Sequence, residues 1–370
     1  MNNKLLLAGA GTGKTTYIVN EALKSKERIL ITTYTLKCRD EIKNKIISLL
    51  GYIPNNIVVQ TWFSFLLEHG VKPYKKDLNI KIINGICFVE GKSGVRYYNK
   101  KGYPVYYGET EFQKHYFDDN NRVYTDKISK LVMRIDKASN GLVFERIGLV
   151  FKKIYIDEVQ DFVGYDLEVI KKMSETCNSL VVVGDPRQNV YNTHCDSKYD
   201  KYSSGKIHEF ILNECKNSNF KIDLTSLNTC RRCHKDIVSF LNHFYPDYGN
   251  LESIDIPPNN EQGIFIVRTK DVEKYLEKFN PVQLRYSIRT KVSEKYKAEN
   301  YRNSKGATYN RTLIYPTNDF REYLKSNKKI SSDITRNAIY VALSRAIDSV
   351  AIVYDGSVNE LNNINIWSLE

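Results

Sequence analysis

Short apolar runs recur along the chain, and each one predicts a buried β-strand. They occur at Lys4–Leu7, Arg28–Thr32, Ile57–Gln60, Ile154–Asp157, Leu180–Gly184, Ile222–Thr225, Ile264–Val267, Thr312–Tyr315 and Val350–Tyr354. Segments with helical spacing of apolar residues lie between several of these runs, at Thr15–Leu23, Arg39–Leu50, Leu167–Ser174 and Lys235–Phe244. Short hydrophobic strands that alternate with helices are typical of parallel sheets with buried strands. We therefore expect an α/β fold.

Two segments interrupt this alternation. Residues 71–139 are rich in Lys, Tyr, Gly and Asn and look like an insertion into the first sheet domain. Residues 192–208 are polar and lead toward a second domain. A chain of 370 residues suffices for two domains of roughly 150 residues each. The expected organisation is a first domain at 1–70 and 140–215, the insertion at 71–139, and a second domain at 216–370.

Net charge, apolar content and cysteine usage indicate which kind of partner and which cellular compartment to expect. The formal net charge of +12 suits a polyanionic partner such as nucleic acid, although a solvated Lys-rich surface explains it equally well. No apolar run is long enough to predict a membrane span. The seven cysteines are scattered and no export signal is evident, so we expect reduced thiols in a cytoplasmic protein.

A phosphate-binding loop follows the first predicted strand. Residues 8–15 read AGAGTGKT, and a predicted helix comes directly after them. Backbone N–H groups of such a loop cradle phosphates at a helix N-terminus, the Lys reaches the β- and γ-phosphates, and the Thr hydroxyl holds Mg²⁺. The sequence therefore predicts an NTP site. Its expected ligands are Gly9, Ala10, Gly11, Thr12, Gly13, Lys14, Thr15 and Thr16.

Two later strands also end in polar clusters. Asp157 follows an apolar strand and is expected to hold Mg²⁺, and the adjacent Glu158 is expected to polarise the attacking water as general base. Adjacent acids at a strand end also serve as helix caps. Gln188, in the segment that follows Leu180–Gly184, is expected to sense the γ-phosphate; an ordinary strand-to-loop turn is the alternative.

These motifs, with others in the same order, resemble the superfamily 1 helicases of the UvrD/Rep type. The matching segments are residues 8–15, Ile31–Thr35, Gln60–Phe65, Asp157–Asp161, Gly184–Gln188, Cys230–Cys233 with Ile237 and Asn242, Ser304–Tyr309 and Tyr340–Ala346. The resemblance implies two RecA-like domains with the NTP site in the cleft between them. It also implies ATP and Mg²⁺ as ligands and single-stranded DNA as partner.

The resemblance assigns further residues. It carries over Arg232 and Arg345 as γ-phosphate contacts, beside Lys14, Glu158 and Gln188 as catalytic groups. Arg231 and Gly306 are expected near the nucleotide. The expected nucleic-acid contacts are Thr33, Tyr34, Thr61, Trp62, Phe63, Arg302 and Ser304. Trp62 and Phe65 are equally compatible with core residues at the start of a helix.

Several family features are altered on the base and ribose side of the nucleotide. The family has a Gln some way before the phosphate loop, but only seven residues precede the loop here, which leaves no room for it. Arg231 stands where the family has an aromatic residue, and Thr308 stands where it has a Glu. Because the phosphate and metal groups are intact, we expect weak base discrimination, with other NTPs used beside ATP. On the strand side, Thr193 replaces a stacking aromatic residue unless His194 substitutes for it.

The spacing of the later motifs leaves no space for the large accessory domain of the family, because only 73 positions (305 − 232) separate Arg232 from Lys305. We expect an NTP-dependent 3′–5′ translocase or helicase on single-stranded DNA. Two alternatives stay open: a nucleotide-dependent switch that licenses a partner such as a nuclease in phage defence, and an RNA helicase. Cys230, Cys233, His194 and Cys195 could also supply zinc ligands, although not in finger spacing.

Overall fold

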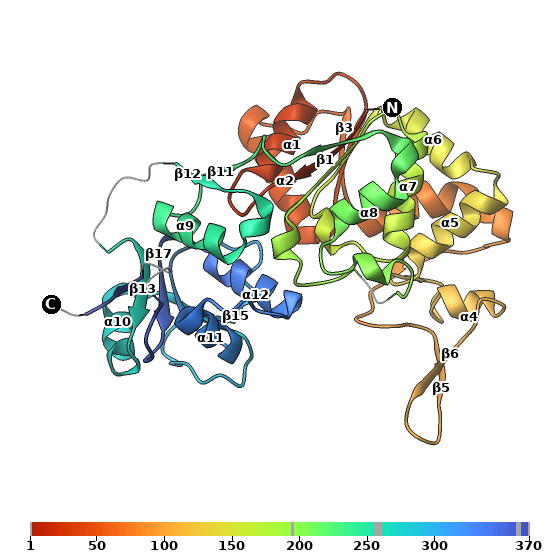
Figure 1. Cartoon of the computed structure of the whole chain (residues 1–370). Coiled ribbons are helices and arrows are strands. Elements are labelled where there is room, and N and C mark those ends of the chain that lie inside the picture. Colours follow the sequence, from red (N-terminus) through yellow and green to blue (C-terminus); the bar gives the residue numbers. More distant parts are fainter. Residues whose placement is uncertain (1, 194–195, 255–260, 360–363, 369–370) are drawn as a thin grey trace. The chain divides into compact units, whose positions relative to one another are not determined.

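The computed structural model describes residues 2–193, 196–254, 261–359 and 364–368, and contacts divide the chain into two compact units (Figure 1). Unit 1 comprises residues 1–6, 15–184 and 192–223. Unit 2 comprises residues 7–14, 185–191 and 224–370. The phosphate loop and the segment around Gln188 therefore group with the C-terminal part of the chain. The domain boundaries expected from the sequence stay a prediction.

Unit 1 is built on a six-stranded sheet with the order β10-β1-β9-β8-β2-β3. The pairs β10–β1, β9–β8, β8–β2 and β2–β3 run parallel. All residues of β2 and β9 are buried, as their continuous apolar sequences require. The strands are β1 (Asn3–Leu7), β2 (Ile29–Thr33), β3 (Ile57–Thr61), β8 (Lys153–Ile156), β9 (Leu180–Gly184) and β10 (Phe220–Asp223).

Helices connect these strands and turn their apolar faces inward. Helix α1 buries Ile18, Val19 and Ala22, which recur at helical spacing. Helix α2 begins at a cap in which Thr35 Oγ1 accepts from Cys38 N, and it ends at Gly51 in a left-handed conformation. The helices of unit 1 outside the insertion are α1 (Lys14–Leu23), α2 (Leu36–Leu50), α3 (Trp62–Phe65), α5 (Ile128–Ala138), α6 (Leu142–Val150), α7 (Tyr165–Thr176) and α8 (Ile207–Glu214).

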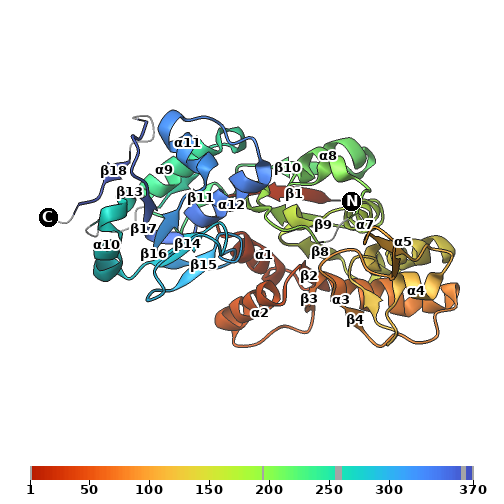
Figure 2. The same cartoon turned by 90° about the horizontal axis from the view of Figure 1, so that it is seen from below.

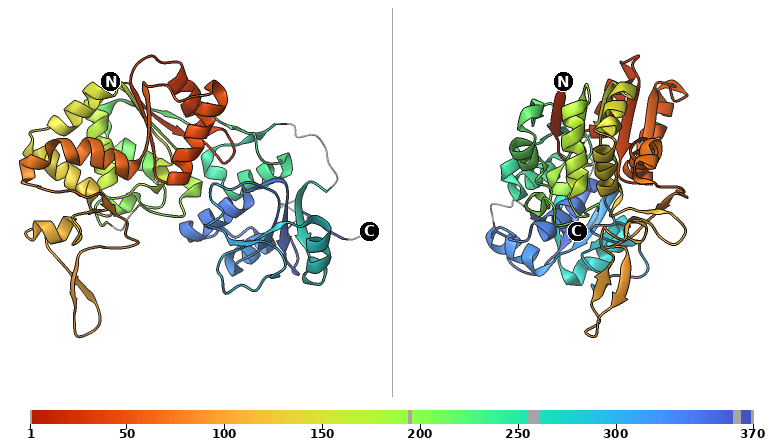
Figure 3. Two further views of the ribbon diagram at one scale, coloured as in Figure 1. Left: turned by 180° about the vertical axis from the view of Figure 1, so that it is seen from behind. Right: turned by 90° about the vertical axis from the view of Figure 1, so that its right-hand side faces the viewer.

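The segment between α3 and α5 carries the inserted elements. It begins with a π-helix (Leu66–Val71) and a 3₁₀-helix (Lys72–Leu78), followed by short strands β4 (Ile86–Cys87), β5 (Val95–Tyr98), β6 (Pro104–Tyr106) and β7 (Val123–Tyr124) and helix α4 (Phe112–Tyr116). Strands β5 and β6 form an antiparallel hairpin. This hairpin extends away from the helices of its own unit (Figures 1 and 3).

Unit 2 contains a second six-stranded sheet, whose strands are labelled in Figure 2, with the order β15-β14-β16-β17-β13-β18 and all pairings parallel. Its strands are β13 (Gly263–Val267), β14 (Val282–Arg285), β15 (Ala298–Asn300), β16 (Tyr309–Tyr315), β17 (Ala346–Val353) and β18 (Asn365–Ile366). A separate parallel pair joins β11 (Thr229–Cys230) to β12 (Glu252–Ser253).

Alternating residues of this sheet pack against helices on its two faces. Ile264, Ile266 and Ile352 share one core with residues of α9 (Lys235–Phe244), α11 (Asn318–Ser326) and α12 (Asp333–Leu343). Val267 and Ala351 pack instead with α10 (Val272–Phe279) and Trp367. Successive side chains of a strand point to opposite faces, so one buried strand contributes to two cores.

The expectation of an α/β fold with two parallel sheets is confirmed. Each predicted strand and helix has a counterpart within a few residues. In the two six-stranded sheets, strands β14, β15 and β18 are additional to the predicted ones, and the short strands β4–β7, β11 and β12 lie outside these sheets. Helix α5 occupies the last part of the range expected for the insertion, and it buries Leu131, Val132 and Ile135 in unit 1. Within the described residues, no helix combines the length and the apolar character needed to span a membrane.

Candidate nucleotide and nucleic-acid sites

The phosphate loop turns between β1 and α1. Gly11 and Gly13 have positive φ in this turn, a backbone conformation that residues with a Cβ atom rarely adopt. Lys14 is the first residue of α1, so the loop leads into a helix N-terminus. The ammonium group of Lys14 donates to the carbonyl oxygens of Ala8 at 3.2 Å and Gly9 at 3.0 Å. The cation expected to contact phosphates is thus held within the loop.

The residues expected to bind metal and water lie at the ends of α1 and β8 in unit 1. The Thr15 hydroxyl donates to Asp157 Oδ2 at 3.4 Å, and Asp157 is buried. Glu158 has a left-handed backbone (φ 58°), and its carboxylate accepts from the amide of Gln160. The structure therefore brings Thr15 together with Asp157 and fixes the direction of Glu158.

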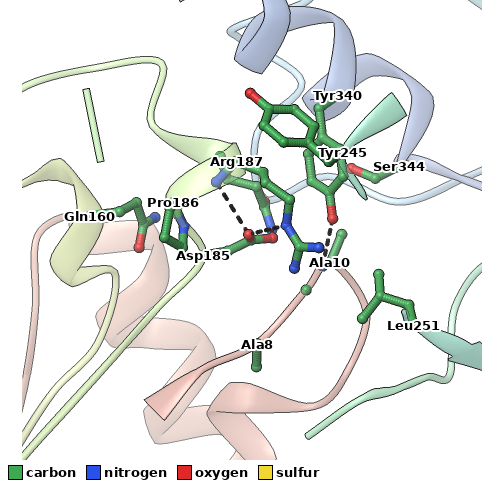
Figure 4. A network of polar contacts seen from close by, with 12 residues as sticks. Ala8, Ala10, Gln160, Asp185, Pro186, Arg187, Tyr245, Leu251, Tyr340 and Ser344 are labelled. Carbon is green, nitrogen blue, oxygen red and sulfur yellow. Dashed lines mark hydrogen bonds and ion pairs between the residues drawn. The ribbon is translucent and has the colours of Figure 1, made fainter. Parts of the chain in front are cut away.

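A buried ion pair organises the segment after β9 (Figure 4). Arg187 Nε lies 2.7 Å from Asp185 Oδ1, and the side chains are 4% and 0% exposed. Burial opposes ionisation of Asp185, but the charges of Arg187 and Lys14 hold its pKa below the usual value. The other carboxylate oxygen accepts from Gln188 Nε2 at 2.8 Å. Asp185 therefore orients the predicted γ-phosphate sensor.

Arg345 is 1% exposed, and its guanidinium group is hydrogen-bonded on several sides. Nε donates to Val341 O at 2.9 Å, and Nη1 donates to Ala307 O at 3.4 Å. Nη2 donates to Ser344 Oγ at 2.8 Å and to Gln188 Oε1 at 3.2 Å. The arginine and glutamine assigned to the γ-phosphate by resemblance are in direct contact.

Helix α12 holds two loops through residues that the sequence analysis did not single out for a role. The Asn337 amide donates to the carbonyl oxygens of Asn189 at 2.9 Å and Pro186 at 3.4 Å. The backbone N–H of Ala10 in the phosphate loop donates to the Tyr340 hydroxyl at 3.3 Å (Figure 4). An Asn directly before the largely apolar run Ala338–Leu343 is the signal that could have revealed Asn337, which is buried.

The segment after β11 packs directly against the phosphate loop. Arg231 N donates to Gly11 O at 2.8 Å, while the Arg231 side chain is exposed. A Cβ atom on Gly11 would lie 2.7 Å from Arg232 Cβ and 2.9 Å from Cys230 Sγ. Arg232 also donates to Ser344 O at 3.2 Å, next to Arg345. Glycine is therefore required at position 11 by both conformation and space.

The two cysteines of this segment interact with each other. A hydrogen bond from the Cys233 thiol lowers the pKa of Cys230 to about 6, against the effect of burial. His194 and Cys195, the other zinc ligands considered, lie outside the described residues. In the part of the chain that the structure describes, no three His, Cys, Asp or Glu side chains form a group able to hold a metal ion.

The residues expected to contact nucleic acid divide into accessible and covered ones. The Tyr34 hydroxyl donates to Thr193 O at 3.3 Å, and its ring meets Phe63 edge-on at 5.5 Å. Phe63 is 3% exposed. Its ring centroid lies 6.2 Å from that of Phe88, which is 72% exposed. Thr193, at the position of the expected aromatic residue, is buried and its N–H donates to Asp161 O.

Trp62 has the environment of a core residue. It is fully buried, its indole N–H donates to Asp166 Oδ1 at 2.8 Å, and its ring lies 4.7 Å from that of Phe162. Phe65 is likewise fully buried. A base contact by Trp62 would require this packing to open. In this structure Trp62 and Phe65 are therefore core residues.

The remaining predicted contacts are threonines near β2 and β3 and a loop before β16. Thr33 is fully buried, and Thr61 caps α3 by accepting from Ser64 N. Ser304 is buried and donates to Tyr301 O at 2.7 Å, and the half-buried Arg302 lies over the ring of Tyr286. Gly306 in the same loop has positive φ, and Thr308 is exposed. These contacts remain predictions.

Two family models match the chain. One, described as an AAA domain, matches residues 1–194, and the other, described as a viral superfamily 1 RNA helicase core domain, matches residues 116–354. Each match covers at least half of the chain. The two matches together include the phosphate loop and all the later motifs up to Ala346.

Similar proteins include two bacterial helicases and a viral one. The ATP-dependent DNA helicase PcrA of Bacillus subtilis is 23% identical over 311 residues, covering 71% of this chain and 40% of PcrA. Rep of Buchnera aphidicola is 25% identical over 232 residues, covering 51% of this chain and 34% of Rep. The solved arterivirus nonstructural protein 10 helicase with DNA is 15% identical, with a TM-score of 0.47, covering 95% of this chain and 60% of that one.

The chain thus spans less than half of the length of the two bacterial relatives. The motif order that first indicated a resemblance is matched by family models across both sheets. This chain belongs to the superfamily 1 helicases, of the type that includes PcrA and Rep.

Proposed function

We propose that this chain is an NTP-driven motor that moves 3′ to 5′ along single-stranded DNA and unwinds duplexes. The supporting observation is a hydrogen-bond chain within unit 1. The turn Val159–Asp161, which directly follows Glu158, accepts at Asp161 O from Thr193 N, and Thr193 O accepts from Tyr34. A change at the proposed general base is thereby relayed to a proposed strand contact.

The proposed chemistry uses groups of ordinary phosphoryl-transfer enzymes. Thr15 Oγ1 and Asp157 Oδ2 lie 3.4 Å apart and suit Mg²⁺, which is often held by one or two protein groups together with water and phosphates. When bound, Mg²⁺ would neutralise phosphate charge. Glu158 accepts a proton from the attacking water. Arg232 and Arg345 stabilise charge that develops on the γ-phosphate.

Single-stranded DNA is expected to stimulate NTP hydrolysis by about tenfold or more, equivalent to ~1.4 kcal/mol of barrier. The reason is that strand contact at Tyr34 orders the turn that carries Glu158. Steady-state hydrolysis with matched DNA and RNA oligonucleotides, and with duplex, tests the track. Strand displacement with 3′- and 5′-tailed duplexes tests polarity. Hydrolysis indifferent to every nucleic acid would refute the motor, and opening of only the 5′-tailed duplex would refute the polarity.

A second prediction concerns the nucleotide base. Arg231 presents an exposed side chain where the family has an aromatic residue, and Thr308 stands in place of a Glu near the ribose. We expect GTP, UTP and CTP to be hydrolysed at rates comparable to ATP, because these groups leave only the phosphates strongly recognised. Parallel kcat/KM measurements on the four NTPs test this expectation. A strict ATP preference would contradict it.

One observation favours a second candidate function, a nucleotide-dependent switch that licenses a protein partner. Thr193, at the position where the family stacks an aromatic residue on the strand, is buried and bonded to backbone groups. Such a position cannot grip a base. Robust hydrolysis without nucleic acid, combined with no strand displacement, is the result that would favour the switch over the motor.

A further inference from the structure

The β5–β6 hairpin has an unusual composition for a surface loop. Residues 91–107 read GKSGVRYYNKKGYPVYY and contain four basic residues, five tyrosines and no acidic residue. The basic residues are Lys92, Arg96, Lys100 and Lys101, and the tyrosines are Tyr97, Tyr98, Tyr103, Tyr106 and Tyr107. Positive charge interleaved with aromatic rings is the combination that binds the backbone and bases of single-stranded nucleic acid.

The tyrosines near the tip of the hairpin are not used by the fold. Tyr97, Tyr98 and Tyr103 are 54%, 67% and 65% exposed. Tyr97 and Tyr98 are consecutive in β5, so their rings leave opposite sides of the strand. All four residues of β5 are exposed. A two-stranded hairpin without a buried face gains little stability from such rings, which therefore point to a ligand.

The hairpin is nevertheless fixed at both ends. At the tip, the Asn99 side chain accepts from Lys101 N at 2.9 Å and Tyr103 N at 3.0 Å, and Gly102 N donates to Asn99 O. At the base, His115 Nδ1 lies 2.8 Å from Tyr107 O. A preset shape lowers the entropic cost of binding.

The base of the hairpin has a second attachment to unit 1. Asp126 accepts from Ser93 N at 2.9 Å and from Ser93 Oγ at 2.6 Å, and Lys127 Nζ donates to Ser93 O at 2.9 Å. Lys127 is 5% exposed, so this attachment lies inside the unit rather than on its surface. The exposed residues of the hairpin are therefore carried by a buried polar anchor.

An aromatic row leads from the strand-contact motifs toward the inserted elements. Tyr34 meets Phe63 at 5.5 Å, and Phe63 meets Phe88 at 6.2 Å. Phe88 directly follows β4 and is 72% exposed. Residues 89–94 then connect Phe88 to the first strand of the hairpin. Ring contacts thus continue from the predicted strand contacts through the buried Phe63 to the exposed Phe88 within one compact unit.

We propose that the β5–β6 hairpin is a second binding surface for single-stranded nucleic acid, outside the helicase motifs. Tyr97, Tyr98 and Tyr103 stack on unpaired bases, and Lys100 and Lys101 contact phosphates. This inference rests on the proposed function, because the strand held by the hairpin is the one on which the motor acts. The hairpin lengthens the bound segment beyond the part held by the motif residues.

The test compares the affinity for an oligonucleotide of about 8 nucleotides with the affinity for one of about 30 nucleotides. The longer strand exceeds the span of one binding module and can therefore contact both the motif residues and the hairpin. A Tyr97→Ser, Tyr98→Ser, Tyr103→Ser variant is expected to keep the affinity of the wild type for the short strand. It is expected to lose about tenfold or more for the long strand, because three stacking rings are removed. A Tyr52→Ser variant is the matched control, since Tyr52 is 63% exposed elsewhere in unit 1.

Charge is tested separately through the salt dependence of binding to the long strand. Lys100→Gln with Lys101→Gln is expected to reduce the slope of log affinity against log salt by roughly 1.4, at about 0.7 per phosphate contact of a single strand. Lys325→Gln with Lys328→Gln, at exposed positions in unit 2, is expected to leave the slope unchanged.

The possible failures are distinguishable. If the wild type binds the long strand and the tyrosine variant binds it equally well, the hairpin inference is wrong while the motor stands. If the wild type binds neither strand, the proposed function itself fails. If the variant loses affinity for duplex but not for the long single strand, the occupant is duplex and the inference is also wrong. Circular dichroism of the variants confirms that the exposed substitutions leave the fold intact.

Discussion

Replacement of Glu158 by Gln is expected to lower the rate of NTP hydrolysis by about 10²- to 10⁴-fold while NTP binding persists. Gln has nearly the same shape and can remain beside Gln160, but it cannot accept a proton from water. We expect the substitution to keep the left-handed backbone of position 158 (φ 58°), and with it the direction of the side chain. Single-turnover hydrolysis, with binding of a fluorescent NTP measured in parallel, separates the two properties.

The matched control for this experiment is Glu145→Gln, because Glu145 is an exposed glutamate on α6 of the same unit. It is expected to hydrolyse NTP at the wild-type rate. Turnover of Glu158→Gln within about twofold of the wild type, a difference of under ~0.5 kcal/mol in barrier, would exclude Glu158 as the general base.

Replacement of Arg345 by Lys is expected to lower kcat by about 10³-fold or more, as loss of an arginine that contacts the transferring phosphate does in related chemistry. Lysine keeps the charge but lacks the planar fork whose three nitrogens donate to Val341 O, Ala307 O and Gln188 Oε1. Because the site is buried, the free energy of unfolding is also expected to fall, by about 1–3 kcal/mol for unsatisfied acceptors. Kinetics and denaturant unfolding of the same preparation measure both.

Arg311→Lys separates catalysis from stability. Arg311 donates to Glu261 O at 2.7 Å and to Ser349 Oγ at 2.9 Å, within the sheet of unit 2. Its replacement is expected to lower stability by a similar amount and to leave kcat unchanged. Equal losses of kcat in the two variants would show that Arg345 acts only through the fold.

The sequence predicted those parts of the fold that carry a continuous apolar signal. Leu180–Gly184 consists of apolar residues and one Gly, and β9 has those same bounds. Strand β15, by contrast, reads Ala298-Glu-Asn300 and contains no pattern that distinguishes it from a loop. It becomes a strand because β14 offers an edge with which it pairs in parallel. Tertiary pairing supplied what local propensity did not.

Helix α5 lies within the range expected for the insertion for a different reason. Ile128, Leu131, Val132 and Ile135 have helical spacing and are all buried, so the signal was present in the sequence. The composition of the surrounding residues, however, indicates an insertion. Average composition over 71–139 conceals the change from polar surface elements to a helix of the core.

The position of a candidate site residue was predictable where a polar residue follows a strand directly, as with Asp157 after β8, although its role stays a prediction. Contacts that depend on a particular turn or that join distant segments were not predictable. The Asp185–Arg187 ion pair requires a specific turn, and the contact of Arg345 with Gln188 spans 157 positions in sequence. Trp62 illustrates a choice that sequence left open, because an aromatic residue at the start of a helix suits either a base or a core. In the structure Trp62 donates a buried hydrogen bond to Asp166, as a core residue does.

Helix α12 has a mechanical consequence. Asn337 and Tyr340 lie three residues apart; Asn337 donates to the carbonyl oxygen of Asn189, and the Tyr340 hydroxyl accepts from the N–H of Ala10. Arg345 follows the C-terminal end of the same helix. A helix translates as a rigid rod, so its two loop contacts and its terminal guanidinium share one displacement. The phosphate loop cannot shift at Ala10 without either breaking the bond to Tyr340 or carrying Arg345 with it.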